Sequence, residues 1–216
     1  ETEAMNRLLE YLKDFNADPD RVADTLKFDE ASAEMRRIAE SVAMPKDMEE
    51  TIKQYYQELC TMTGCENIYV ATRSAGPVSH PGQYETYLNV CGADDVVANV
   101  RKVWSSTFNT RSIIARARLG LPLHYDPIGV AVLAMVDAKA AGVMFTVNPI
   151  NGDPSKVAIE GSFGFGEAVV SGNVTPDRYV VDKVTLEIEE RVVSDKQLVF
   201  IRYHPLFYLQ GNLVNY

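Results

Sequence analysis

The chain has 216 residues, of which 46% are hydrophobic and 24% are charged, a composition typical of globular domains. This balance excludes intrinsic disorder, collagen and a long coiled coil. No apolar run approaches the roughly 18 residues of a membrane-spanning helix, and the first residues lack the pattern of a signal peptide. The net charge of −9 argues against general nucleic-acid binding. Three cysteines are too few for a disulfide framework, so the sequence predicts a cytoplasmic protein with reduced thiols.

Residues 1–66 carry the periodicity of amphipathic helices. Pro19 and Pro45, the prolines of this segment, fall at breaks between helical runs. We therefore expect a helical subdomain over 1–66. Apolar residues that recur there at spacings of three and four include Met5, Leu8, Leu9, Leu12, Ala31, Met35, Ile38 and Val42.

From residue 67 onward the pattern changes to short runs rich in Val and Ile, separated by Gly, Pro, Asn and Asp. Helical runs are expected only over 96–108 and 111–119, where Trp104 has the spacing of a core residue. The other connections are too short for crossover helices, which favours a mostly antiparallel sheet. The sequence thus predicts an α+β fold with a core over 67–196, and a tail over 197–216 of unknown role. The expected strands are 67–72, 84–90, 128–136, 141–147, 156–160, 177–181 and 185–193.

The stretch 96–125 contains five bases and no acid. Two interpretations fit this pattern: a solvated basic helix face, or a local positive field for a phosphorylated small molecule. The bases are Arg101, Lys102, Arg111, Arg116 and Arg118.

Two loops have the composition of an anion-binding segment. In Arg73–Gly82, an arginine leaves a strand and enters small and turn residues, which let backbone N–H groups approach an anion. In Gly161–Gly172, Gly164 and Gly166 form a G-x-G, but Val169 occupies the place of the third glycine of a dinucleotide fingerprint. A simple glycine-rich turn is the alternative interpretation there.

Taken together, five ordered motifs resemble the ATP-binding part of the phosphoenolpyruvate synthase and pyruvate phosphate dikinase family. This resemblance implies an ATP-grasp-like nucleotide-binding core over 67–196. It also implies that ATP phosphorylates a histidine on a separate swivelling domain or second subunit. The phosphohistidine then transfers its phosphoryl group to a small-molecule acceptor. The motifs are Ala71–Ala75, Pro81–Val90, Val100–Asn109 with Arg111, Gly142–Pro149, and Gly164–Gly172 with Thr175–Asp177 and Tyr179.

Carried over by position, the resemblance implies a phosphate-binding role for Arg73 and places the hydroxyl of Thr86 beside the nucleotide. Arg111 matches a motif arginine and is expected to contact phosphate. For Glu167 and Asp177, in the glycine-rich and Pro-Asp motifs, a structural role and a ligand role are equally open, and Glu167 is included among the candidate nucleotide ligands. Arg73 and Arg111 are the candidate catalytic residues.

The chain also departs from the family pattern. Leu133 occupies a position where the family commonly has a glutamine near the adenine. The glycine-rich segment with an ATP-binding lysine does not occur in these residues, nor does the Glu and Gln-x-Arg segment that holds Mg²⁺ and phosphate. The cofactors implied are ATP and Mg²⁺, but the metal ligands are left unassigned. His80 precedes Pro81, which places it in a nucleotide-loop motif rather than in a phosphate-carrier motif.

The function predicted from this resemblance is an ATP-binding subunit or fragment of a phosphotransferase that acts with a partner. Within the family, the chain most resembles the separately encoded ATP subunit of phenylphosphate synthase, which implies phenol as the final acceptor. Pyruvate and an antibiotic are the other acceptors that the resemblance permits. The alternative is a non-catalytic regulatory module that has lost the lysine and metal-binding segments and only contacts a partner.

Overall fold

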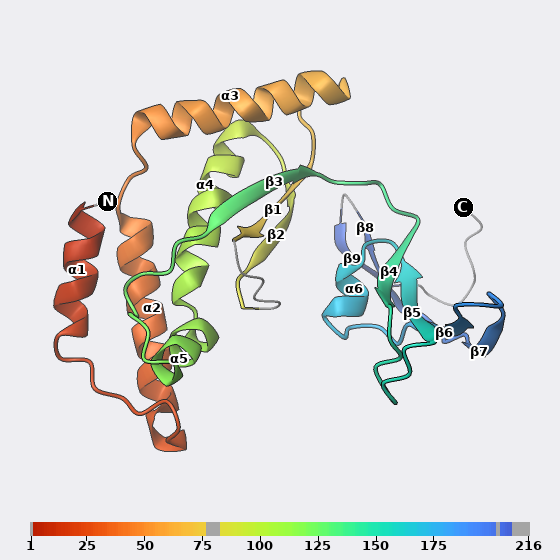
Figure 1. Cartoon of the computed structure of the whole chain (residues 1–216). Helices are drawn as coiled ribbons and strands as arrows, with labels where there is room; N and C mark the ends of the chain where they lie inside the picture. Colours follow the sequence, from red (N-terminus) through yellow and green to blue (C-terminus); the bar gives the residue numbers. More distant parts are fainter. Residues whose placement is uncertain (1, 77–82, 202–203, 209–216) are drawn as a thin grey trace. The chain divides into compact units, whose positions relative to one another are not determined.

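The computed structural model describes residues 2–76, 83–201 and 204–208 (Figure 1). The chain divides into two compact units, Glu1–Met135 and Val136–Tyr216, called here the first and second units. The boundary falls inside 67–196, the range predicted as one core. Among the described residues, no helix is both long and apolar enough to cross a membrane.

The first unit begins with the predicted helical segment. Helix α3 ends where Gly64 adopts a φ of +67° and its N–H caps the last carbonyls, a left-handed conformation that glycine adopts without steric cost. The helices of this unit are α1 (Thr2–Leu12), α2 (Thr25–Ser41), α3 (Lys46–Thr63), α4 (Ala93–Ser105) and α5 (Thr110–Arg118), with short 3₁₀ turns at Val22–Asp24 and Ser106–Phe108.

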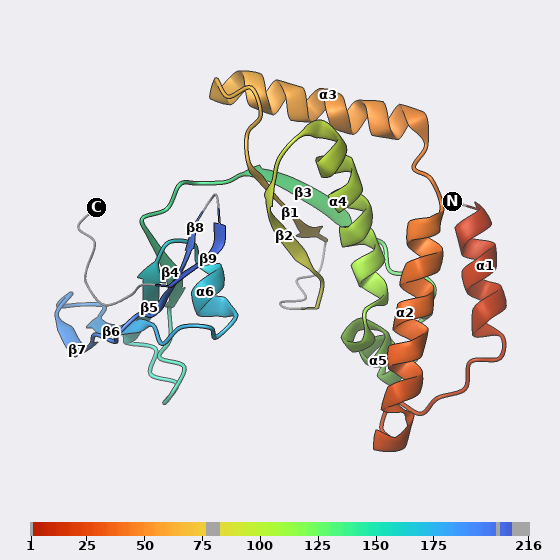
Figure 2. The ribbon, with the colours of Figure 1, turned by 180° about the vertical axis from the view of Figure 1, so that it is seen from behind.

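A three-stranded antiparallel sheet completes the first unit. It consists of β1 (Val70–Ala75), β2 (Thr86–Val90) and β3 (Gly129–Ala134) in the order β2-β1-β3, so that β1 is central. Helix α4 packs against this sheet and against α3, as the two opposite views show (Figures 1 and 2).

Two apolar clusters hold the first unit together. One joins α1, α2 and α5 around Phe28 and Met35, and Phe15 packs edge-on against Phe28 with ring centroids 5.4 Å apart. The other lies between the sheet and helices α3 and α4, around Val70 and Val96. Trp104 packs against this second cluster, which confirms the core position that its helical spacing predicted.

The second unit is a four-stranded antiparallel sheet in the order β4-β5-β6-β7, with a short helix and a separate hairpin. Strands β4 and β5 approach closely at Gly142, where an added Cβ would lie 2.1 Å from the backbone oxygen of Glu160. Together the two units confirm the predicted α+β fold with antiparallel pairing. The elements are β4 (Ala140–Phe145), β5 (Lys156–Phe163), α6 (Glu167–Val170), β6 (Asp177–Asp182), β7 (Ile188–Val192), β8 (Leu198–Ile201) and β9 (His204–Tyr208).

Candidate functional site

The sheet of the first unit has one face buried by helices and one open face. Val70 and Thr72 on β1 are fully buried toward the helices. Because side chains alternate along a strand, Ala71 and Arg73 lie on the opposite face. Arg73 is exposed, as this geometry requires for an open face.

Strand pairing places Thr86 directly opposite Arg73. The two residues are Cα partners in the antiparallel ladder between β1 and β2, and both are exposed. Directly opposite residues share a face, with Cβ atoms about 5 Å apart in such ladders. The two residues predicted to lie beside the nucleotide therefore stand next to each other on the open face.

Leu133 belongs to the same open face. It is the partner of Ala71 in the ladder between β1 and β3, and it is 49% exposed. The residue that replaces the expected glutamine thus lies on the face that carries Arg73, one strand away. It offers an apolar contact there and no hydrogen bond.

A β-bulge in β2 sets which residue faces Arg73. Val70 pairs with Val90, but two residues further along β1 the partner is Tyr87, so β2 contains one extra residue. Asn89 lies in this bulge with a φ of +57°, and its backbone N–H donates to the Sδ of Met135 at 3.0 Å.

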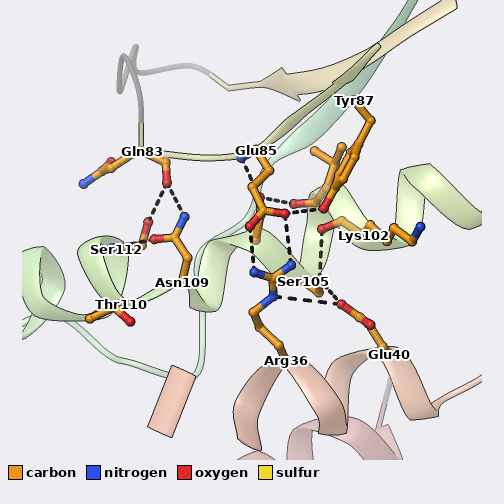
Figure 3. Close-up of polar contacts among 12 residues, drawn as sticks. Arg36, Glu40, Gln83, Glu85, Tyr87, Lys102, Ser105, Asn109, Thr110 and Ser112 are labelled. Atoms are coloured by element: carbon orange, nitrogen blue, oxygen red, sulfur yellow. Dashed lines mark hydrogen bonds and ion pairs between the residues drawn. The ribbon is translucent and has the colours of Figure 1, made fainter. Parts of the chain in front are cut away.

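The start of β2 is attached to the N-terminus of α5. The side-chain amide of Asn109 and the hydroxyl of Ser112 both donate to the backbone oxygen of Gln83 (Figure 3). Asn109 also caps α5, because its side-chain oxygen accepts the Ser112 N–H at 2.9 Å. Arg111 lies in the first turn of this helix, and its charge contributes to lowering the pKa of Glu85. Arg111 is therefore within electrostatic reach of β2.

Glu85 is the centre of a polar network between α2, α4 and the start of β2 (Figure 3). Arg36 donates to both carboxylate oxygens at 2.6 and 3.0 Å, and the Tyr87 hydroxyl donates to one of them. The Glu85 N–H donates to the Ser106 hydroxyl at 3.1 Å. Burial opposes ionisation of this carboxyl, but the hydrogen bonds from Arg36 and Tyr87 outweigh it and hold its pKa below the ordinary value.

On the α2 side, Glu40 extends the Glu85 network. Its carboxylate accepts a hydrogen bond from Ser105 at 2.5 Å and lies 4.0 Å from Arg36 (Figure 3). This network was not predictable from the spacing of its residues in the sequence. The only signal for it was Glu85 itself, which lies inside the family motif Pro81–Val90 next to Thr86.

Most bases of the acid-free stretch 96–125 serve the fold of the first unit. Arg101 donates to the backbone oxygens of Glu40 and Val42, and Lys102 lies 5.7 Å from the ring centre of Tyr87. Neither interpretation describes Arg101, because it makes tertiary hydrogen bonds, whereas Lys102 is exposed, as the solvated-face interpretation predicts.

Arg116 and Arg118 likewise make tertiary contacts, as ion pairs. Arg116 is buried and pairs with Asp126 at 2.6 Å, and Arg118 pairs with Asp20 at 2.9 Å. Within the part of the chain that the structure describes, Arg111 makes no hydrogen bond or ion pair through its side chain. The same holds, over those residues, for Arg73.

Glu167 and Asp177 lie in the second unit. Glu167 begins α6 and is exposed. Asp177 is engaged by its own chain, since its carboxylate pairs with Lys196 and accepts the Ser194 N–H at 2.9 Å. This pairing gives Asp177 a structural role. His80, with Pro81 and Gly82, lies outside the described residues.

The described residues offer no ready metal centre. Over those residues, no group of three or more His, Cys, Asp and Glu side chains is placed to hold an ion. Among the described strand residues, the open face of the first unit carries Arg73, Thr86 and Leu133 but no carboxylate, so these residues do not fit Mg²⁺.

Comparisons with known proteins identify the family of the chain. Residues 2–205 match the family described as pyruvate phosphate dikinase, AMP/ATP-binding domain. The phosphoenolpyruvate synthase of Pyrococcus furiosus is 40% identical over 187 residues, which cover 84% of this chain and 23% of that protein. A probable phosphoenolpyruvate synthase of Methanocaldococcus jannaschii is 38% identical over 208 residues, covering 94% of this chain and 17% of that protein. A third, from Archaeoglobus fulgidus, is 44% identical over 187 residues, covering 84% of this chain and 25% of that protein.

The fold and these matches define the class of the protein as an ATP-grasp-like nucleotide-binding domain of α+β architecture. More particularly, the chain belongs to the pyruvate phosphate dikinase AMP/ATP-binding domain family, and its relatives carry the name phosphoenolpyruvate synthase. The chain spans about a quarter of the length of the relatives it matches, between 17% and 27%.

Proposed function

We propose that the open face of the β2-β1-β3 sheet binds the phosphates of ATP through Arg73. The observation that carries this proposal is an exposed guanidinium on the central strand, beside the hydroxyl of Thr86, which makes no ion pair among the described residues. A guanidinium fork matches phosphate oxygens in charge and geometry, and a hydroxyl beside it adds a hydrogen bond. Membership of an AMP/ATP-binding domain family supports ATP as the ligand.

Arg111 is the second phosphate contact in this proposal. It is exposed in the first turn of α5, a helix end that itself favours anions, and α5 is tied to the start of β2. Glu167, which is exposed at the start of α6 in the second unit, stays a prediction from the glycine-rich motif and is not part of the proposed site.

The reaction that we propose is transfer of a phosphoryl group from ATP to a histidine on another domain or subunit. A bond forms between the histidine nitrogen and phosphorus, the bond from that phosphorus to the bridging oxygen of ATP breaks, and the remaining nucleotide leaves. Phosphoryl transfer requires positioning and charge neutralisation more than covalent participation of the protein, so Arg73 and Arg111 act by holding the transferring group. The acceptor histidine lies outside the set of site residues named here. The relatives' name favours pyruvate over phenol as the final acceptor. Because the described residues of this face do not fit Mg²⁺, the metal has no role in the proposed step.

The first test is titration of the protein that carries this chain with ATP at fixed ionic strength. Arg73→Met should weaken binding by roughly tenfold to a hundredfold, the usual worth of a charge-assisted hydrogen bond. The matched control is Arg21→Met, which removes another exposed guanidinium of the first unit that is distant from the sheet in sequence. Equal affinity of the two variants for ATP would refute the phosphate role of Arg73.

A second test separates the enzyme from a regulatory module. After incubation with ATP radiolabelled at the β-phosphate or, in a parallel reaction, at the γ-phosphate, one of the two labels should appear as acid-labile phosphate on the partner domain or subunit. Label on His80 of this chain would contradict the proposal. ATP binding without transfer to any partner would favour the regulatory alternative.

A further inference from the structure

The Glu85 network includes an ion pair that the phosphate-binding proposal does not use. Arg36 and Glu85 are 49 residues apart in sequence and form a two-pronged pair between α2 and the residue that precedes β2. Both side chains are partly buried, with exposures of 28% and 35%. A pair of this geometry fixes the position of the backbone that carries it.

The pair lies at the start of β2, where it helps to determine which side chains of the strand face the helices. Glu85 and Tyr87 are joined to each other and to the helices, because Tyr87 donates to Glu85 and packs against the cluster of α3 and α4. Since side chains alternate along a strand, two residues held on the helix face force Thr86, between them, onto the open face.

Because of the bulge, β2 needs contacts that fix its register against β1. Without the extra residue in β2, the pairing of Val70 with Val90 would continue and bring Tyr87 opposite Arg73. A shift of one residue moves every following side chain to the other face of a sheet. Contacts beyond the bulge must therefore select the observed register. At this end of β2 they include those of Gln83, Glu85 and Tyr87, beside the hydrogen bond from the Tyr84 hydroxyl to Asp126.

We infer that the Arg36–Glu85 pair is a positioning device for the nucleotide site, which locks β2 in the register that sets Thr86 beside Arg73. The inference rests on the proposed function of that open face. Arg36 and Glu85 are positioning residues, because they act through Thr86 and touch no phosphate themselves.

The experiment compares Arg36→Met, Glu85→Gln and the double variant in the protein that carries this chain. The matched control is Arg37→Met, which breaks the adjacent two-pronged pair of Arg37 with Glu34 at 2.8 and 2.5 Å, on the same helix but without contact to β2. Two quantities are measured: the affinity for ATP, and the hydrogen exchange of backbone amides over 83–90 without nucleotide.

We expect Arg36→Met and Glu85→Gln each to weaken ATP binding by about tenfold, with the double variant no weaker than the worse single one, as coupled partners behave. Amide exchange over 83–90 should be faster in both, and Arg37→Met should change neither quantity. Arg36→Lys, which keeps the charge but not the fork, should restore part of the affinity. If Arg36→Met does not fold, Glu85→Gln, which preserves the side-chain shape, gives the same comparison.

Two outcomes separate this inference from the proposed function. If Arg73→Met weakens ATP binding while Arg36→Met and Glu85→Gln behave like Arg37→Met, the positioning role is wrong and the phosphate role stands. If the unmodified protein binds no ATP, the proposed function fails. Faster exchange over 83–90 in Arg36→Met would in that case support only the register lock.

Discussion

Replacing Arg116 by Met should destabilise the first unit severely, although this arginine is one of the bases that a charge count assigns to a ligand field. Its guanidinium is buried and donates to the Asp126 carboxylate at 2.6 Å and to the backbone oxygen of Thr107 at 2.7 Å. A further N–H donates to the backbone oxygen of Leu123 at 3.2 Å, and the group lies 5.8 Å from the ring centre of Phe108.

The expected loss of unfolding free energy follows from the carboxylate that Arg116→Met leaves without its ion-pair partner. Removing one member of a buried ion pair costs about 3 to 5 kcal/mol, mainly because the other charge loses its partner. Asp126 is 22% exposed and keeps the hydrogen bond from the Tyr84 hydroxyl, which places the expected loss near 3 kcal/mol. The free energy of unfolding of a domain is about 5 to 15 kcal/mol, so a loss near 3 kcal/mol would remove a large fraction of the stability of the first unit.

The assay is urea unfolding followed by the fluorescence of Trp104, the single tryptophan of the chain, which lies in α4 of the first unit. The control is Arg118→Met, whose pair with Asp20 has exposures of 56% and 76% and should contribute at most about 1 kcal/mol. If Arg116→Met does not fold, Asp126→Asn tests the same pair from the other side. A free energy of unfolding for Arg116→Met equal to that of Arg118→Met would refute the reasoning.

Two predictions concern other parts of the chain. Gly142→Ala places a Cβ 2.1 Å from the backbone oxygen of Glu160 and should separate β4 from β5, with faster amide exchange over 140–145, whereas Gly161→Ala meets only Ala141 at 3.5 Å and should be tolerated. Equal protection in both variants would show that the ladder adapts. Because the pKa of Glu85 is lowered from 4.5, the stability due to its ion pair is complete above about pH 5 and is lost as the pH falls through the lowered pKa. The unfolding free energy of Glu85→Gln should therefore fall less steeply with acid than that of the unmodified protein, and parallel curves would contradict this.

The helices were predictable because their apolar spacing is regular, and α5, expected over 111–119, is found at Thr110–Arg118. Strand β1 was placed too early, over 67–72, because Arg73, Ser74 and Ala75 have no apolar alternation. These residues are nevertheless paired with β3 through backbone hydrogen bonds, which the side-chain pattern does not record.

The candidate site was predictable only where a motif carried it. Arg73 and Thr86 came from ordered motifs, and strand pairing brings them together. The role of Arg36 was not predictable, because a charged residue on an amphipathic helix has the pattern of a solvated face. The acid-free stretch was misleading for a related reason: the partners of Arg116 and Arg118 are acids outside the stretch.

Both apolar clusters of the first unit are built from residues that precede its boundary at Met135. The latest contributors are Leu123 to the first cluster and Val132 to the second. Because synthesis runs from the N-terminus, every residue of these clusters leaves the ribosome before the first residue of the second unit does. Domains generally fold as units in this order, so the helices and the sheet with Arg73 can complete their packing while the glycine-rich motif is still being translated.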